Sequence, residues 1–192
     1  MTILIGGLAL FLGVHSVRIV ADRWRAENIT RIGELKWKGL YSLVSLAGFV
    51  FIVWGYGIAR LDSPVVWQPP PWTWSVASLL LLPSFILIVA GNLPGTRMKA
   101  TLGHPMLLGT QLWALGHLLS NGRLAGIVLF GSFLVWSVAD YVSSRRRDLL
   151  KGVVYPAGKA SRDALAIVIG VAAWGVFGYW LHGPLIGVRP FG

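Results

Sequence analysis

Apolar residues in this chain gather into six runs separated by short polar segments. About twenty apolar residues are needed for a helix to cross the hydrocarbon core of a membrane, and each run comes near that length. The runs cover residues 2–20, 39–59, 73–91, 104–120, 123–142 and 163–182. We therefore predict an all-α fold, a polytopic transmembrane helical bundle of six helices that forms a single domain over residues 1–192.

Two of these runs differ from an ordinary lipid-facing helix. The first lacks basic residues at its start and is not followed by an A-x-A cleavage site, so we interpret it as a retained helix and not as a signal peptide. The fourth is short and contains Gly, Thr, Gln and two His, which favours a place inside the bundle. The Asn121-Gly122 pair after it predicts an antiparallel hairpin with the fifth run.

The composition indicates a membrane protein and excludes several other classes of protein. Hydrophobic residues make up 55% of the chain and charged residues 12%, about half of what a soluble domain carries. A soluble enzyme, a disordered tail and a secreted disulfide scaffold are therefore excluded. Since the chain has no cysteine, a cofactor must be held by His, carboxylate, Tyr, Met or backbone groups.

The net charge of +10 lies mostly on one side of the predicted bundle. Fourteen of the seventeen Lys and Arg residues fall in the connections after the first, third and fifth runs. The positive-inside rule predicts that these connections are cytoplasmic and that both termini lie outside. We assign this charge to anionic lipid headgroups and not to nucleic acid, and residues 143–162 are long enough for a short surface helix.

Proline and glycine add local expectations. The segment from Pro64 to Pro71, with tryptophans nearby, predicts a stiff, extended connection at the membrane interface. Pro83 predicts a kink in the third helix. Faces rich in glycine predict close helix packing at Gly126, Gly131, Gly170, Gly175 and Gly178.

Polar residues inside the runs are the candidate functional residues, because such residues are rare in membranes and face the bundle interior. They are His15, Arg18, Asn92, His104, Gln111, His117, Asp140 and His182. All four histidines lie in or at the edge of a run. Imidazole is the commonest metal ligand, and a b-type haem needs no cysteine and fits between bundle helices.

Depth along the helices limits which histidines share one iron. His104 and His117 are about 20 Å apart along one helix and cannot do so. His15 and His117 differ in depth by about 12 Å, which suits two imidazoles on opposite faces of a haem. The pair His15 and His104 also remains open. His182 is expected near the outer interface, in a solvated or headgroup-facing position.

Two charged residues have both a functional and a simpler interpretation. Arg18 lies one turn from His15, where it pairs with a haem propionate or extends toward the interface. Asp140 either orients a histidine or pairs with Arg145, and the ion pair is the simpler role.

The motifs resemble those of the NnrU family of membrane proteins. The resemblance rests on Gly13-Val-His-Ser-Val-Arg18, on the run from Leu102 to Gly122, and on Leu129-Phe-Gly-Ser-Phe-Leu-Val-Trp136. Bacterial members are associated with denitrification, and the plant and cyanobacterial relative, 15-cis-ζ-carotene isomerase, contains a b-type haem. The resemblance implies haem b held by His15 and His117, a protein of the bacterial plasma membrane, and a hydrophobic, carotenoid-like substrate as one option.

Two other functions remain open. Isoprenylcysteine methyltransferases carry an Arg-His-Pro-x-Tyr-x-Gly motif that binds S-adenosylmethionine, but at His104-Pro105 this chain lacks the Arg and the Tyr. A non-enzymatic assembly or regulatory factor for respiratory reductases is the third hypothesis. Isomerisation of a carotenoid further requires a long apolar groove beside the haem.

Overall fold

The computed structural model describes residues 1–190, and the regular secondary structure of this part of the chain is helical, with no strand other than two isolated bridges. The all-α prediction is therefore confirmed. The elements are α1 (Thr2–Val20), α2 (Asp22–Ile32), α3 (Glu34–Asp62), α4 (Trp72–Asn92), α5 (Arg97–Leu102), α6 (Pro105–Ser120), α7 (Leu124–Leu150), α8 (Ala160–Val176), the π-helical turn η1 (Phe177–Leu181) and α9 (His182–Ile186).

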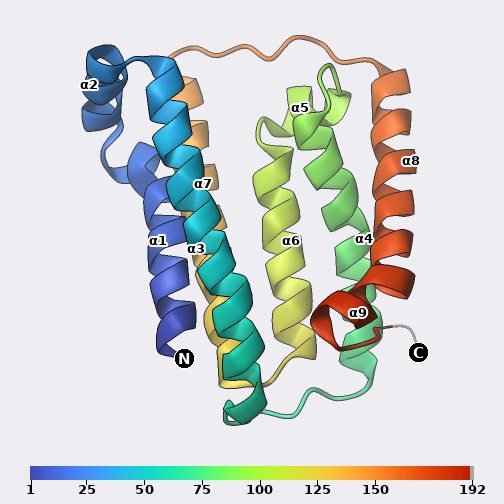
Figure 1. Ribbon diagram of the computed structural model, residues 1–192. Coiled ribbons are helices and arrows are strands. Elements are labelled where there is room, and N and C mark those ends of the chain that lie inside the picture. The colour runs from blue at the N-terminus through green and yellow to red at the C-terminus, as the bar shows by residue number, and fades with distance from the viewer. Residues whose placement is uncertain (191–192) are drawn as a thin grey trace.

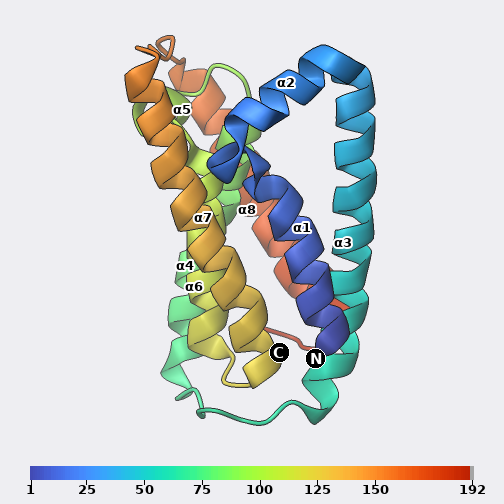
Figure 2. The same ribbon diagram turned by 90° about the vertical axis from the view of Figure 1, so that its left-hand side faces the viewer.

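The helices form two groups that α7 joins. Helix α1 packs along α3 in one group, while α6 and α8 pack on α4 in the other. Helix α7 contacts α1, α3 and α6, so it lies between the groups, as Figures 1 and 2 show. Residues of both groups, and of α7, line the cavity described below.

Five segments of residues 1–190 are long and apolar enough to cross a membrane. They are α1, α3, α4, α7 and the stretch Ala160–Ile186. The fourth predicted span forms α6, whose 16 residues reach about 24 Å, short of the ~30 Å hydrocarbon core. Five long apolar helices are therefore confirmed, and the count of six is not. Helix α6 does form the predicted antiparallel hairpin with α7.

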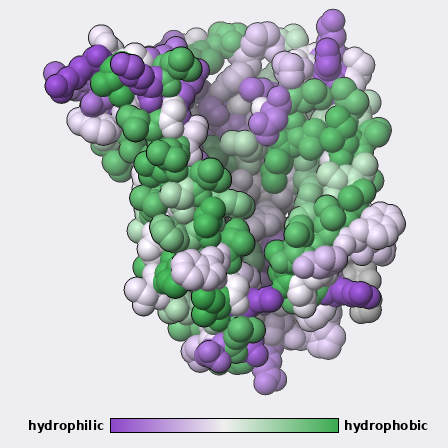
Figure 3. All heavy atoms as spheres, in the orientation of Figure 1, coloured by the Kyte–Doolittle hydropathy of each residue, from purple (hydrophilic) through white to green (hydrophobic). Residues whose placement is uncertain are grey.

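Exposed apolar side chains cover the sides of the bundle. Figure 3 shows hydrophobic residues over the flanks and hydrophilic residues gathered toward the ends. Leu43, Leu79 and Val168 are 65%, 70% and 65% exposed, values that a water-facing helix would not favour. The distribution fits a protein surrounded by lipid.

The basic connections lie at one end of the bundle. Helix α2, helix α5 and the connection from α7 to α8 are together at the upper end in Figure 1, whereas α1 begins at the lower end. The sorting of charge predicted from the sequence is thus visible in the fold. Which end faces the cytoplasm stays a prediction.

The surface helix forms in a different place from the one predicted. Within residues 143–162, α7 continues to Leu150 and residues 151–158 form no helix. Arg147 extends α7, because its guanidinium donates to Ser143 and Ser144 and lies 3.5 Å from Asp140. The charged surface helix is α2, in which no residue is buried.

The proline-rich connection packs on the hairpin turn. Residues 66–70 have no regular helix, as predicted, and the amide of Val66 donates to the carbonyl of Gly122. The amide of Leu124 donates to Pro64 O, which fixes the start of α7. Helix α4 runs without a break through Pro83.

Candidate functional site

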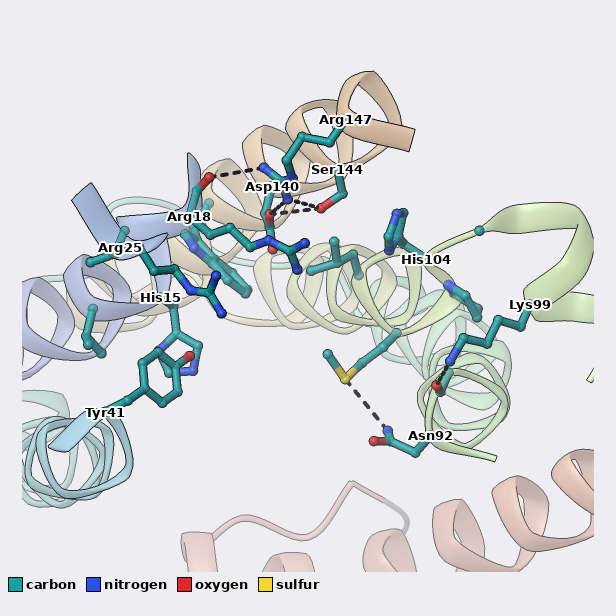
Figure 4. Close-up of a pocket in the computed structure, with 18 of the residues that line it drawn as sticks. His15, Arg18, Arg25, Tyr41, Asn92, Lys99, His104, Asp140, Ser144 and Arg147 are labelled. Atoms are coloured by element: carbon teal, nitrogen blue, oxygen red, sulfur yellow. Dashed lines mark hydrogen bonds and ion pairs between the residues drawn. The ribbon is translucent and has the colours of Figure 1, made fainter. Parts of the chain in front are cut away.

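A cavity of about 500 Å³ opens between the two helix groups near the end that carries α2. This volume is within the range of small-molecule and cofactor sites. One wall carries His15 from α1, Tyr41 from α3 and Trp136 from α7, and the other carries His104 and Met106 at the start of α6. Figure 3 shows the molecule hollowed between the groups, and Figure 4 shows His15 and His104 on opposite sides of the cavity.

His15 is held in one tautomer by its own helix. Its Nδ1 lies 2.7 Å from the carbonyl oxygen of Phe11, which only accepts, so Nδ1 carries the proton. The ring stacks on Phe11 at 4.2 Å and lies 5.1 Å from Tyr41 and 5.8 Å from Trp136. Nε2 of His15 therefore keeps its lone pair, which is the form in which an imidazole binds a metal.

His117 repeats this arrangement lower in the bundle. Its Nδ1 lies 2.8 Å from the carbonyl oxygen of Trp113, and its ring stacks on Phe130 at 4.5 Å. The Nε2 lone pair is again the one available to a metal. His182, from α9, lies 6.5 Å from His117 between ring centroids.

Aromatic rings connect the His15 and His117 positions. Phe133 of α7 lies 5.8 Å from Phe11 and 5.5 Å from Trp113. His15 follows Phe11 by one turn toward one end of the bundle, and His117 follows Trp113 by one turn toward the other. Each of these steps adds about 6 Å of helical rise, in opposite directions along the bundle.

The cavity is lined by an excess of positive charge. Its cationic side chains are Arg18, Arg25, Lys38, Lys99 and Arg147. Asp140 is the acidic residue of this lining, and it pairs with Arg147 at 3.5 Å and accepts from Ser144 at 3.2 Å. The pairing of Asp140 with Arg145 expected from the sequence is wrong, because Arg145 lies beside Asp148 instead, at 3.9 Å.

The position of Arg18 agrees in part with each of the two roles expected from the sequence. Its side chain is 55% exposed, with its Nε 4.0 Å from Asp22, and it also lines the cavity. Figure 4 shows Arg18 and Arg25 on the same side of the cavity as His15, with Lys99 across from them. The cationic lining suits an anionic group such as a carboxylate or phosphate.

His104 is held in a small polar cluster at the end of α7. Its Nε2 lies 2.9 Å from Asp148 Oδ2 and 3.2 Å from Tyr155 Oη, and the tyrosine hydroxyl donates to Asp148 at 2.7 Å. These contacts join the start of α6 to the connection after α7. Sequence reasoning did not single out Asp148 or Tyr155, because their separation from His104 along the chain carries no signal.

The other two polar candidates are satisfied within the bundle. Gln111 donates to the carbonyl of Ser137 on α7 at 3.2 Å, and Asn92 donates to Ile88 O at 2.8 Å. Gln111 therefore joins α6 to α7, whereas Asn92 bonds within α4 and lines the cavity. Among residues 1–190, His, Asp and Glu side chains form no group of three or more able to hold a metal ion.

We expect the stability of the folded protein to depend on pH through Tyr155. Burial, together with the hydrogen bond to Asp148, raises the pKa of Tyr155 to about 12 from its usual 10. The folded chain thus keeps this proton while the unfolded chain loses it, so the Tyr155 contribution is full below pH 10 and falls as the pH rises toward 12. We expect thermal unfolding in detergent, compared between wild type and Tyr155→Phe, to show this alkaline loss in wild type only. Parallel curves from pH 9 to 12 would contradict the assignment.

Comparison with known proteins gives one match. The sequence model of the family described as NnrU protein matches residues 3–190, nearly the whole chain. No curated protein and no solved structure matches the chain. The all-helical bundle, the apolar flanks and the motif histidines placed inside it agree with this assignment. The chain belongs to the NnrU family.

Proposed function

We propose that this NnrU-family chain is a haem-b-binding integral membrane protein, with His15 and His117 as the axial ligands. The observation that carries the proposal is the shared anchoring of these two rings. Each donates Nδ1–H to the carbonyl four residues earlier, at 2.7 Å and 2.8 Å, and so keeps Nε2 as a lone-pair donor. Metal-ligating histidines generally donate their other ring N–H to such a partner.

The residues around His15 fit a haem in two further respects. Tyr41 and Trp136 supply flat apolar surface beside the imidazole, as a porphyrin requires. The cations of the cavity lining supply partners for two propionates, with Arg18 and Arg25 on the same side as His15. A bound haem would supply one-electron or Lewis-acid chemistry, and this chain's residues would orient it and exclude water.

A second opening favours an apolar substrate. A groove of about 820 Å³ runs between α1 and α7, lined largely by Leu, Ile, Val and Ala side chains. Trp136 lines both this groove and the cavity beside His15. An elongated hydrocarbon in the groove would therefore lie next to the proposed cofactor. This arrangement supports redox-linked chemistry of the cis-trans isomerisation type, with a nitric oxide or denitrification role as the other candidate.

Helix α6 is proposed as a sixth membrane crossing. In Figure 1 it runs between the two ends of the bundle, and it packs between α4 and α7. Contact with helices on both sides makes a full lipid-spanning length less necessary than for an exposed helix. With six crossings, the basic end is cytoplasmic and both termini are outside a bacterial plasma membrane.

The methyltransferase alternative depends on the start of α6. His104 precedes Pro105 there, but its Nε2 lies within hydrogen-bond reach of Asp148 and Tyr155. That cluster explains His104 as a residue that fixes the α6 start. Binding of S-adenosylmethionine to the purified protein would favour this alternative.

An absorption spectrum tests the proposal. Protein purified in detergent after expression with excess haem is expected to show a Soret band and, after dithionite, sharp α and β bands of a six-coordinate low-spin b-haem. A pyridine haemochrome assay should give about one haem per chain. A colourless protein would overturn the proposal, and a haem-free regulatory or assembly role would then stand.

A further inference from the structure

The cavity beside α2 opens to the side of the bundle. Helix α3 packs on α1, α2 and α7, and within residues 1–190 it makes no extensive contact with α4 or α6. Residues of α3, α4 and α6 nevertheless line the same cavity, and the surface is hollowed there in Figure 3. Since the opening lies near the basic end, a membrane would place it at the level of the lipid headgroups.

The lining carries more positive charge than its own carboxylate can balance. Five cationic side chains and one acidic side chain line the cavity, an excess of four positive charges with the histidines neutral. The acidic residue, Asp140, is already paired with Arg147 at 3.5 Å. Like charges gathered in a recess beside apolar helices repel one another, so an anion bound among them stabilises the fold.

Lys99 on α5 has no acidic partner in the part of the chain that the structure describes. Its Nζ donates to the carbonyl of Gly91 at 3.3 Å, which leaves two N–H donors. No carboxylate of residues 1–190 lies within 4.0 Å of this ammonium group. Because the side chain is partly buried at the cavity wall, water balances its charge only in part.

Arg18 and Arg25 face Lys99 from the opposite wall. Both lie near Asp22, but at 4.0 Å and 3.9 Å, distances longer than a hydrogen bond. Figure 4 shows both guanidinium groups pointing into the cavity, with Lys99 on the far side. Donors on two sides of one space suit a phosphate, because its oxygens accept hydrogen bonds from several directions.

Charged and apolar residues of the cavity follow one another in depth. On α1, Arg18 lies near the basic end, and Val14 lies one turn deeper. On α3, Lys38 lies near the basic end, and Tyr41 lies about one turn deeper. A membrane lipid has the same order, with an anionic headgroup at the surface and apolar chains below it. The lining therefore fits an amphiphile better than a free anion.

We propose that this cavity binds the phosphate group of an anionic membrane phospholipid. Arg18, Arg25 and Lys99 hold the phosphate, and the acyl chains leave through the side opening past Val14 and Tyr41. The cavity of about 500 Å³ accommodates the headgroup. This inference does not rest on the haem proposal, because two propionates would balance only two of the four charges in excess.

Titration of the detergent-purified protein with phosphatidylglycerol, followed by native mass spectrometry, tests the site. The wild type is expected to retain one such lipid per chain, and not phosphatidylcholine, whose headgroup has no net charge. Arg25→Gln combined with Lys99→Gln should bind phosphatidylglycerol about 25-fold more weakly, at about fivefold for each cation lost near an anionic lipid. Glutamine at position 99 keeps an amide donor for Gly91.

Arg23→Gln combined with Arg97→Gln is the matched control. It removes the same charge from the same two helices, α2 and α5, but both residues are exposed and neither lines the cavity. This variant should retain the lipid as the wild type does. Equal weakening in the two double variants would overturn the inference, since general attraction to the basic end would then explain the binding.

Inorganic phosphate separates the two sources of a phosphate group. Added at the same concentration as the lipid, it should leave the retained phosphatidylglycerol in place. Displacement of the lipid would identify a free anion as the ligand and overturn the inference, as would equal retention of phosphatidylcholine. The Soret band of the wild type is recorded separately, so failure of lipid binding leaves the haem proposal intact.

Discussion

Replacing Gly55 with alanine is expected to destabilise the bundle, although alanine is the better helix former. A Cβ at Gly55 would clash with the backbone nitrogen of Leu4 and lie 2.7 Å from Leu4 Cα. Neither atom can move without moving α1 away from α3. Overpacking of this kind costs about 1–3 kcal/mol, which outweighs the ~1 kcal/mol that alanine gains over glycine in a helix.

Gly57 is the matched control for this prediction. It lies two residues further along α3, and a Cβ there would meet nothing within 4 Å. Gly57→Ala should therefore be neutral or stabilising by up to about 1 kcal/mol. The measurement is unfolding of both variants in detergent micelles, followed by circular dichroism. If Gly55→Ala and Gly57→Ala unfold at the same temperature, α1 and α3 do not pack as described.

The α1–α3 contact illustrates what the sequence could not predict. Gly48 and Gly55 are seven residues apart on α3, and their partners Phe11 and Leu4 are on α1. Glycine spacing on one helix indicates a packing face but not which helix covers it. Of the glycines predicted to pack against another helix, Gly170 does so, against Ile86 of α4. Gly126 meets only the side chain of Asn121 in the turn before α7, and Gly131 and Gly175 have nothing within 4 Å.

The long apolar helices could be predicted because the length of an apolar run is enough to indicate each one. Their ends were harder to predict: α7 continues past its apolar part because Arg147 contacts Asp140 and Ser144. Likewise α2 is charged along its length and lacks the apolar signal of a span. Polar side chains that bond along one helix extend it without leaving a hydropathy pattern.

The histidines were found from the sequence because an imidazole in an apolar run stands out. Their neighbours Tyr41 and Trp136 did not stand out among many aromatic residues, and only the fold brings them to His15. The last run was predicted to be one regular helix that ends at His182. The π turn after Val176 redirects the chain, and single-sequence periodicity gives no sign of it.

His117→Ala is expected to abolish the six-coordinate spectrum of the haem. His117 is one of the two proposed axial ligands, so its loss leaves no bis-histidine arrangement. His15→Ala should remove that arrangement in the same way. Absorption spectra and haem stoichiometry of the two variants and the wild type, purified in parallel, measure the loss.

His104→Ala is the control that separates ligation from structure. His104 also lines the cavity, but its contacts with Asp148 and Tyr155 tie the start of α6 to the end of α7. Losing these hydrogen bonds should lower the free energy of unfolding by about 1 kcal/mol for each bond, and with it the unfolding temperature. The Soret band should persist. The reverse outcome, with bands lost in His104→Ala and kept in His117→Ala, would assign the iron to His15 and His104. The cavity between those two residues would then be the whole of the haem site, and His117 would have no part in it.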